Sequence, residues 1–281
     1  MTAGVQPAAG NAGGRGGRRT AARGLGLAAS AARRLWLVAL LALAWWLVAA
    51  LGWVAPYKLP APGDVWSALA DGFSERGLGD AALATLVLLA EGWALGVGAA
   101  VAIGIVTGEV RWLEDGIRPL VAGLQSVPTI AFLPLAILWL GFGDTAVLAI
   151  TAFGTFKPML LTTYAAIRQV PPTLLQAGRA LGARGLFYQR TLLLPAIVPS
   201  LVVGLKLSWS FAWRALMAAE IIVSGSAGLG GVLELGRQIN AIDVVIAVIV
   251  LIAAIGIVCE QLVFGRFERF VNRRWGLVAA R

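Results

Sequence analysis

Charged side chains that interrupt long apolar runs are the residues of this 281-residue sequence with the clearest chemical meaning. They are Glu91, Lys157, Lys206, Arg214 and Glu220. A charge in hydrocarbon is costly, so these side chains are expected to face the interior of a helix bundle or a water-filled path. Three cations and two carboxylates predict either an electropositive path for small anions or an ion-paired interior that touches no substrate.

The apolar run 197–223 carries a stripe of such residues on one helical face, at spacings of 4, 3, 4 and 3. The stripe holds Lys206, Ser210, Trp213, Met217 and Glu220, and Arg214 borders it. Arg214 and Glu220 point in different directions, so we expect their partners on other helices. The predicted path residues are Lys157, Ser210, Trp213, Arg214, Met217 and Glu220. Packing is the alternative role for Trp213, and Lys206 is expected to be structural because it lies near the inner face.

Several chemistries are excluded by residues that the sequence lacks. There is no histidine and only one cysteine, Cys259, which excludes a disulfide framework, Cys/His metal sites and histidine-based catalytic triads within the chain. None of the lysines, Lys58, Lys157 and Lys206, precedes Ser or Thr, so the phosphate-binding loop of nucleotide hydrolases is absent. We therefore expect no cofactor on this chain, no enzymatic role, and any ATP to be handled by a partner.

Composition places these residues in a membrane protein. Hydrophobic residues make up 59% of the chain, charged residues 13%, and the mean hydropathy is +0.84. The pattern predicts an all-α protein with six transmembrane helices. The predicted spans are 35–54, 81–107, 119–140, 145–167, 197–223 and 241–264. Pro128 and Pro134 break the third span, which favours a transporter core over a simple anchor.

The distribution of basic residues predicts the orientation. Seventeen Lys and Arg residues fall on the side that holds both termini, and three fall on the other side. We therefore expect three parts: a disordered basic cytoplasmic tail at 1–34 that contacts anionic lipid rather than nucleic acid, a membrane domain at 35–264 with a cytoplasmic loop at 168–195, and a basic cytoplasmic tail at 265–281.

The cytoplasmic loop is polar and basic between two apolar runs. Paired prolines at Pro171 predict a helix that starts near Thr173, and Gly182 and Gly185 predict a bend. A second short helix is expected from Leu186 to Leu194, before Pro195. A helix-bend-helix of this kind is a docking surface; the alternative is a solvated loop that lies on the lipid.

This loop carries a resemblance to a known family. Gln176-Ala177-Gly178, then Gly182, then Leu192-x-Leu194-Pro195, is similar to the Glu-Ala-Ala…Gly…Ile-x-Leu-Pro signature of binding-protein-dependent ABC importer permeases. The spacing matches at every position. Gln176, Gly178 and Leu192 depart from the commonest form of the signature.

Further segments resemble the nitrate, sulfonate, taurine and bicarbonate branch of that family. They run from Ser126-Val127-Pro128 to Leu138–Gly143, and from Ala219-Glu220 to Gly228-Leu229-Gly230. The resemblance covers roughly Leu35 to Gly276. It implies a type I (MetI-like) permease fold in a bacterial inner membrane, working as a pair of copies with a cytoplasmic ATPase dimer and an extracytoplasmic solute-binding protein.

The resemblance also implies which residues couple the permease to its ATPase. These are Gln176, Ala177, Gly178, Arg179, Leu181, Gly182, Phe187, Leu192, Leu194 and Pro195. Leu175, Leu181 and Phe187 are the expected apolar anchors. Two alternatives remain open: an importer of another solute, such as a vitamin precursor, and a channel or membrane-embedded enzyme that needs no ATPase.

Overall fold

The computed structural model describes residues 36–108, 111–223 and 225–276, and every regular element in these ranges is helical. The chain divides into two compact units, Met1–Asp64 and Val65–Arg281. The predicted tail at 1–34 lies outside the described residues, and so do residues 277–281 of the C-terminal tail. The three-part division at residues 34 and 264 stays a prediction.

The first unit holds one apolar helix, Trp36–Ala50. The indole N–H of Trp45 donates a hydrogen bond to the carbonyl of Pro60 (3.1 Å), which ties this helix to the segment after it. At about 1.5 Å per residue the helix is shorter than the ~30 Å hydrocarbon layer. The expectation that 35–54 is a full membrane span therefore stays a prediction.

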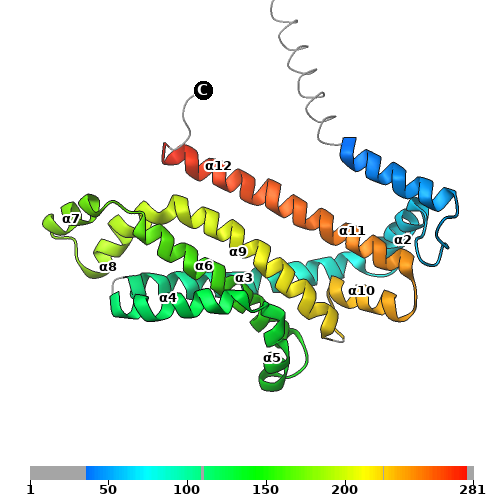
Figure 1. The fold of residues 1–281 in the computed structure, drawn as a ribbon, viewed down its shortest axis with the longest axis horizontal. Helices are drawn as coiled ribbons and strands as arrows, with labels where there is room; N and C mark the ends of the chain where they lie inside the picture. The colour runs from blue at the N-terminus through cyan, green and yellow to red at the C-terminus, as the bar shows by residue number, and fades with distance from the viewer. Residues whose placement is uncertain (1–35, 109–110, 224, 277–281) are drawn as a thin grey trace, which may run out of the picture. The chain divides into compact units, whose positions relative to one another are not determined.

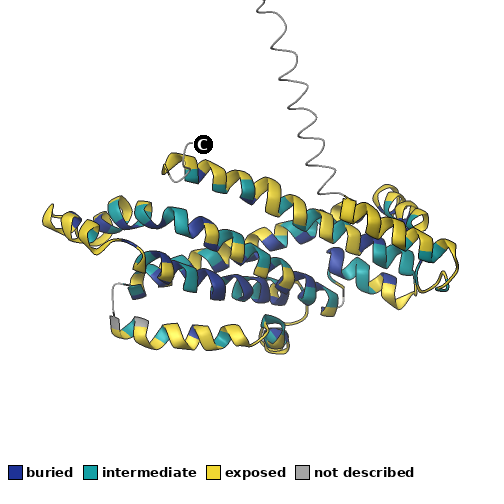
Figure 2. Cartoon of the chain, turned by 45° about the horizontal axis from the view of Figure 1, so that its top comes forward, coloured by how far each residue is buried: buried dark blue, intermediate teal, exposed yellow. Residues whose placement is uncertain are grey.

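Three long helices form the centre of the second unit: α3 (Leu78–Gly108), α6 (Asp144–Arg168) and α9 (Leu194–Ile222). Figure 1 shows them side by side, and Figure 2 shows the buried residues concentrated on them. Two apolar clusters lie between these helices, one around Leu89, Ile150 and Leu216 and the other around Leu160 and Ile197. The ends of α3 and α6 agree with the predicted second and fourth spans to within a few residues.

Small residues allow α3 and α6 to approach closely. The facing sets are Gly92, Gly96 and Gly104 on α3 and Thr151, Thr155 and Thr163 on α6. Each of these threonine hydroxyls donates to the carbonyl four residues earlier in its own helix, so its methyl group is left to face a glycine. The glycines of α3 therefore let the backbones of the two helices approach closely.

The third predicted span is not one continuous helix. α4 (Arg111–Ser126) is followed by a 3₁₀ turn (Thr129–Phe132) and the short helix α5 (Leu133–Leu140), with a bend of 98° at the break. Pro128 precedes the turn with φ −55° and ψ 130°, and Pro134 lies in the first turn of α5. The prolines therefore break this segment as predicted, although the size of the bend could not be predicted from them.

Further helices precede, connect and follow these three along the chain. They are α2 (Pro62–Ser74), α7 (Pro172–Ala180), α8 (Gly185–Tyr188), α10 (Leu229–Gln238), α11 (Ile242–Val258) and α12 (Gly265–Arg274). A π-helical segment, Cys259–Phe264, joins α11 to α12 without interruption, so the sixth predicted span runs ten residues beyond its expected end.

Four helices of the described residues are long and apolar enough to cross a membrane. They are Leu78–Gly108, Asp144–Arg168, Gly185–Ile222 and Ile242–Arg274. The bent pair formed by α4 and α5 makes a fifth if both halves count as one span. The all-helical membrane fold is thus confirmed, whereas the count of six stays a prediction.

Candidate coupling surface and translocation path

The predicted cytoplasmic loop folds as a helix, a turn and a second helix. Pro172 occupies the first turn of α7, one residue before the predicted start. The turn is at Gly182, whose φ of +87° suits a residue without a side chain, and the N–H of Ala183 closes it on the carbonyl of Gly178 (3.0 Å). The predicted bend is therefore at the predicted glycine.

The second half of the loop differs from the prediction. The helix that begins at Gly185 does not stop before Pro195 but runs without a break to Ile222. Residues Gln189–Leu193 form a π-helical segment immediately before the proline. A proline cannot donate to the preceding turn and its ring crowds the carbonyl four residues earlier. The wider π turn is the local adjustment that accommodates it.

The turn carries an exposed apolar surface. Leu181 is 89% exposed, Leu186 70% and Phe187 65%. Leu175, the third expected anchor, instead packs partly buried against the cluster around Leu160 and Ile197. Leu186 takes its place at the surface, a residue whose role the spacing of the loop signature did not indicate.

Other residues of the loop signature hold it together from inside. Gly178 is buried against the side chain of Leu192, and Leu194 is half-buried in the same cluster. The guanidinium of Arg179 lies 5.4 Å from the ring centroid of Tyr188, at cation–π distance. Gln176, Ala177 and Pro195 are exposed. Some residues of the signature thus pack inside the loop, and others lie on its surface.

Lys157 lies at the break between α4 and α5. Its ammonium group donates to the carbonyls of Leu124 (3.3 Å) and Val127 (3.2 Å), and the residue is only 3% exposed. The rings of Phe132 and Phe153 lie 5.9 and 5.0 Å from the same nitrogen. These carbonyls belong to the C-terminal end of a helix, where a cation is favourable. Lys157 therefore holds the bend as well as contributing charge.

Lys157 and Arg214 line one cavity of about 310 Å³ between the α4–α5 break, α6 and α9. Gln125 and Thr129 also line it, and neither had been singled out in the sequence because neither side chain is charged. Arg214 is exposed, and its Nε donates to the carbonyl of Ser210 (2.9 Å). Among the described residues that line this cavity none is acidic. The structure therefore brings two of the predicted path cations together.

The other predicted path residues lie elsewhere. The side chains of Trp213 and Met217 pack in the apolar cluster around Leu216, and Glu220 is buried near the C-terminal end of α9. Ser210 contributes its carbonyl to Arg214. None of Ser210, Trp213, Met217 or Glu220 lines the cavity that Lys157 and Arg214 share. The helical stripe thus serves mainly helix contacts.

Glu220 connects the end of α9 to α3 and to the start of α10. Its carboxylate accepts hydrogen bonds from the hydroxyl of Thr85 (3.1 Å) and from the N–H of Gly230 (2.9 Å). The N–H of Leu229 donates to the oxygen of Thr85 (2.8 Å). A Cβ on Gly228 or Gly230 would collide with Glu220. The carboxylate therefore caps the N-terminus of α10, where negative charge is favourable.

Lys206 forms an ion pair with a residue on another helix. Its ammonium lies 3.5 Å from a carboxylate oxygen of Glu260, and both side chains are about half exposed. Glu260 lies in the π-helical segment after α11. Glu260 lies within the predicted span 241–264, but it had not been singled out among the charged residues of the apolar runs.

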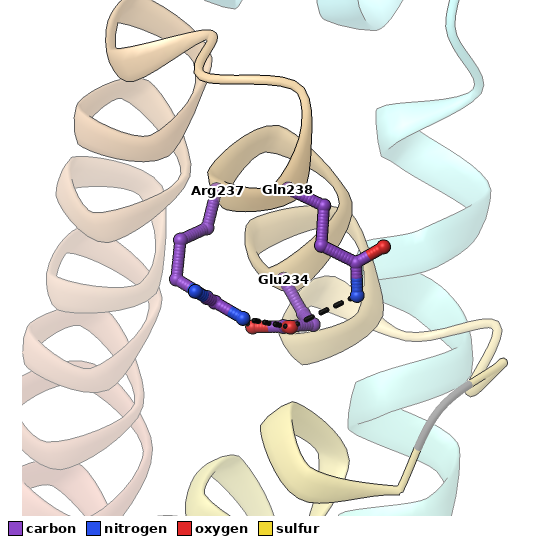
Figure 3. Close-up of polar contacts among 3 residues, drawn as sticks. All are labelled: Glu234, Arg237 and Gln238. Atoms are coloured by element: carbon purple, nitrogen blue, oxygen red, sulfur yellow. Dashed lines mark hydrogen bonds and ion pairs between the residues drawn. The ribbon is translucent and has the colours of Figure 1, made fainter.

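A compact ion pair lies on α10 (Figure 3). Arg237 and Gln238 both donate to the carboxylate of Glu234, with Nε of Arg237 at 2.7 Å and Nε2 of Gln238 at 3.0 Å. These hydrogen bonds lower the pKa of Glu234 to about 2, and the carboxylate raises the pKa of Arg237. This group is part of the segment outside the membrane spans.

Comparison with known proteins agrees with this arrangement. Residues 96–274 match the family described as binding-protein-dependent transport system inner membrane component. The chain is 32% identical over 183 residues to the putative aliphatic sulfonates transport permease protein of Bacillus subtilis, covering 65% of this chain and 64% of that protein. It is 31% identical over 218 residues to the taurine transport system permease protein of Escherichia coli, covering 74% and 77%.

Among solved structures, the inward-facing MetNI methionine ABC transporter has a chain that superposes with a TM-score of 0.59 at 21% identity, covering 69% of this chain and 95% of that one. This likeness shows the MetI-like fold. Together with the family match over most of the chain, it places the protein among the binding-protein-dependent ABC transporter permeases, the membrane components of such transport systems.

Proposed function

We propose that this chain is the transmembrane subunit of an ATP-driven importer for a small oxyanion, with an aliphatic sulfonate or taurine as the leading substrate and nitrate or bicarbonate as related ones. The cavity that Lys157 and Arg214 line carries the proposal, because it has two cations and no acidic residue among its described lining. Such a cavity raises the local concentration of anions. Relatives named for sulfonate and taurine transport support the same substrate class.

ATP acts through partners in this proposal. A dimer of cytoplasmic ATPases docks on the loop 171–195, whose exposed Leu181, Leu186 and Phe187 fit a hydrophobic groove. Closure of the ATPases displaces the loop and moves the permease between outward-open and inward-open states. The chain itself binds no cofactor and catalyses no reaction.

The remaining partners follow from the direction of import. An extracytoplasmic solute-binding protein delivers the substrate, and a second copy of this chain completes the path. Both termini lie in the cytoplasm of a bacterial cell with the protein in its inner membrane, because the basic residues concentrate on that side. Membrane lipid surrounds the exposed apolar helices.

Co-purification tests the docking surface. Gly182→Asp introduces a charged side chain at a φ of +87° in the turn, and we expect it to abolish retention of the ATPase in detergent. Gly141→Asp is the matched control, since Gly141 has a φ of +84° and, like Gly182, no neighbour that a Cβ would meet. Equal retention by both variants would contradict docking at this loop.

Uptake into proteoliposomes tests the substrate. With the ATPase and binding protein present, Arg214→Gln is expected to lower taurine uptake roughly tenfold or more, since it removes a charged hydrogen-bond donor from the cavity, whereas Arg214→Lys keeps the charge and retains more of the rate. ATPase co-purification is the control for assembly. Undiminished taurine uptake by Arg214→Gln would remove Arg214 from the path. No taurine uptake by the wild type would argue for another solute, and uptake without ATP would argue for a channel.

A further inference from the structure

The carbonyl group of Pro195 lacks the donor that an α-helix normally provides. Each carbonyl in an α-helix accepts a hydrogen bond from the N–H four residues later. In the helix Gly185–Ile222, called the long helix below, the residue at that position is Pro199, which has no N–H. This carbonyl therefore needs a donor from elsewhere, and it lies directly after the π-helical segment Gln189–Leu193.

The indole of Trp275 is such a donor. Its Nε1 lies 2.9 Å from the carbonyl oxygen of Pro195, although the two residues are 80 positions apart in the sequence. Trp275 ends α12: its own N–H bonds to the carbonyl of Val271 (3.0 Å), and Gly276 then takes a φ of +67°. Because Val271 is buried, the last turn of α12 is fixed in place, and the indole is held beside the start of α9.

Further contacts join the C-terminal helix, Ile242–Arg274, to the long helix. The ammonium of Lys206 lies 3.5 Å from a carboxylate oxygen of Glu260, and the ring centroid of Trp209 lies 5.4 Å from that of Phe264. Together with the indole contact, these pairs run in opposite directions along the two chains. The two helices therefore lie side by side and antiparallel, with the indole contact nearest the coupling loop.

The carbonyl of Pro195 lies in segment 189–199, where the long helix bends most easily. The π turn in this segment is wider than a regular turn, and Pro199 removes one hydrogen bond from the turn that follows. Kinks in helices occur at features of these two kinds. A hydrogen bond from a second helix limits bending here, because a change of angle moves the carbonyl away from the indole.

We propose that Trp275 is a positioning residue for transport. The hydrogen bond from its indole to the carbonyl of Pro195 holds the shape of segment 189–199, so a displacement of the coupling loop reaches the rest of α9 instead of bending the helix. This role rests on the proposed import function, in which the ATPases move the loop 171–195. Trp275 acts through Pro195 and not on the substrate, since it does not line the proposed translocation cavity.

Pro199 makes a specific test possible. Pro199→Ala gives position 199 an N–H, so the carbonyl of Pro195 gains a donor within its own helix and no longer needs the indole. The indole N–H is removed in two ways: by Trp275→Phe, and by replacing Trp275 with 3-benzothienylalanine, an isostere in which sulfur takes the place of the N–H. Trp45→Phe is the matched control, because the indole of Trp45 also donates to a proline carbonyl, that of Pro60 (3.1 Å), in the first unit.

The first measurement is the amount of taurine imported per ATP hydrolysed, in proteoliposomes that hold the full-length permease, the ATPase and the binding protein. A hydrogen bond of ordinary strength shifts an equilibrium about fivefold. We therefore expect both replacements of Trp275 to lower this ratio by roughly that factor in the native background and to leave it unchanged in the Pro199→Ala background. Trp45→Phe should leave the ratio unchanged, and all variants should retain the ATPase equally.

The second measurement needs neither transport nor ATPase. It is the midpoint of thermal unfolding of the purified permease in detergent, for the native protein, each single variant and the doubles. We expect the replacements of Trp275 to lower the midpoint in the native background and to have no further effect in the Pro199→Ala background. A tryptophan that only packs or anchors at the membrane surface does not depend on residue 199, so its loss has the same effect in both backgrounds.

Each outcome decides for or against the proposal. An equal fall of the import ratio in both backgrounds, or no fall in either, overturns it. A fall with Trp275→Phe but not with the isostere assigns the effect to packing of the ring, which also overturns it. Should Pro199→Ala not fold, the isostere in the native background decides alone. If the wild type imports no taurine, the proposed import function fails, and the unfolding measurements still decide whether Trp275 and Pro199 act on one carbonyl.

Discussion

The side chain of Leu192 fills the space that a side chain on Gly178 would need. A Cβ built on Gly178 lies 2.5 Å from Cδ2 of Leu192, well inside van der Waals contact. Both residues depart from the commonest form of the loop signature, which has Ala and Ile at these positions. The two departures therefore form one packing arrangement: glycine at position 178 on α7 leaves room for the side chain of Leu192, which extends from the π-helical segment.

A double-mutant cycle tests this pairing. Gly178→Ala in the native background is expected to destabilise the protein by about 1 kcal/mol, because the end of the leucine must turn away. The same change in Leu192→Ala is expected to cost nothing or to stabilise the helix. Thermal unfolding of the four proteins gives the coupling energy. Additive effects would mean that the two residues do not share space.

The α3–α6 contact offers a matched pair of glycines. A Cβ on Gly96 lies 2.4 Å from the carbonyl oxygen of Ala152, a backbone atom that cannot turn aside, whereas a Cβ on Gly98 meets nothing within 4 Å. We expect Gly96→Ala to destabilise by about 2–3 kcal/mol or to prevent folding. Gly98→Ala should be neutral or stabilise by up to about 1 kcal/mol. Yield and unfolding midpoint in detergent decide, and similar behaviour of the two variants would contradict the packing.

Lys157 is expected to matter for the bend in the third helix segment. Lys157→Met leaves the carbonyls of Leu124 and Val127 without their donor, at a cost of about 1–3 kcal/mol. Lys206→Met is the control, because the half-exposed pair with Glu260 contributes about 1 kcal/mol at most. We expect only Lys157→Met to lower both the unfolding midpoint and uptake while the ATPase still co-purifies. A fully stable, active Lys157→Met would show that the bend holds without the ammonium group.

The Glu234 pair predicts a specific acid sensitivity. The pKa of Glu234 is about 2 in the folded protein and about 4.3 in an unfolded chain. Its contribution to stability is therefore complete above the unfolded pKa and is lost as the pH falls through about 2. Wild type should lose more of its unfolding midpoint between neutral pH and about pH 3 than Glu234→Gln does. If the unfolding midpoints of both proteins fall equally between these pH values, the Glu234 pair does not cause the acid sensitivity.

The apolar runs predicted most of the membrane helices because hydropathy and length are local properties. α3, α6 and α9 end within a few residues of the expected positions. Glycine also located the turn of the loop, since Gly182 takes the left-handed conformation that other residues avoid. These features depend on one stretch of chain at a time.

Features that depend on two distant stretches could not be predicted. The proline rule placed a helix end before Pro195, but a π turn preserved the helix, and no local signal distinguishes the two. One partner of Glu220 is the backbone N–H of Gly230, and a backbone group of this kind cannot be identified as a partner from the residue type. Glu260 became informative only when its helix was placed beside Lys206.

The uninterrupted helix from Gly185 to Ile222 connects the coupling loop directly to the far end of the membrane domain. Its 38 residues span about 57 Å, from the apolar tip at the coupling loop to the capped end at Glu220. The C-terminal end is held by the hydrogen bonds of Glu220 with Thr85 and Gly230, while the N-terminal end contacts the ATPase in the proposed complex. In the proposed complex, a displacement of the N-terminal end of this helix by the ATPase tilts the helix about its C-terminal end. Arg214, which lies on the same helix, moves with it. The π turn before Pro195 and the interior proline Pro199 are two places where this helix can bend, and bending there reduces the movement that reaches the cavity lined by Lys157 and Arg214.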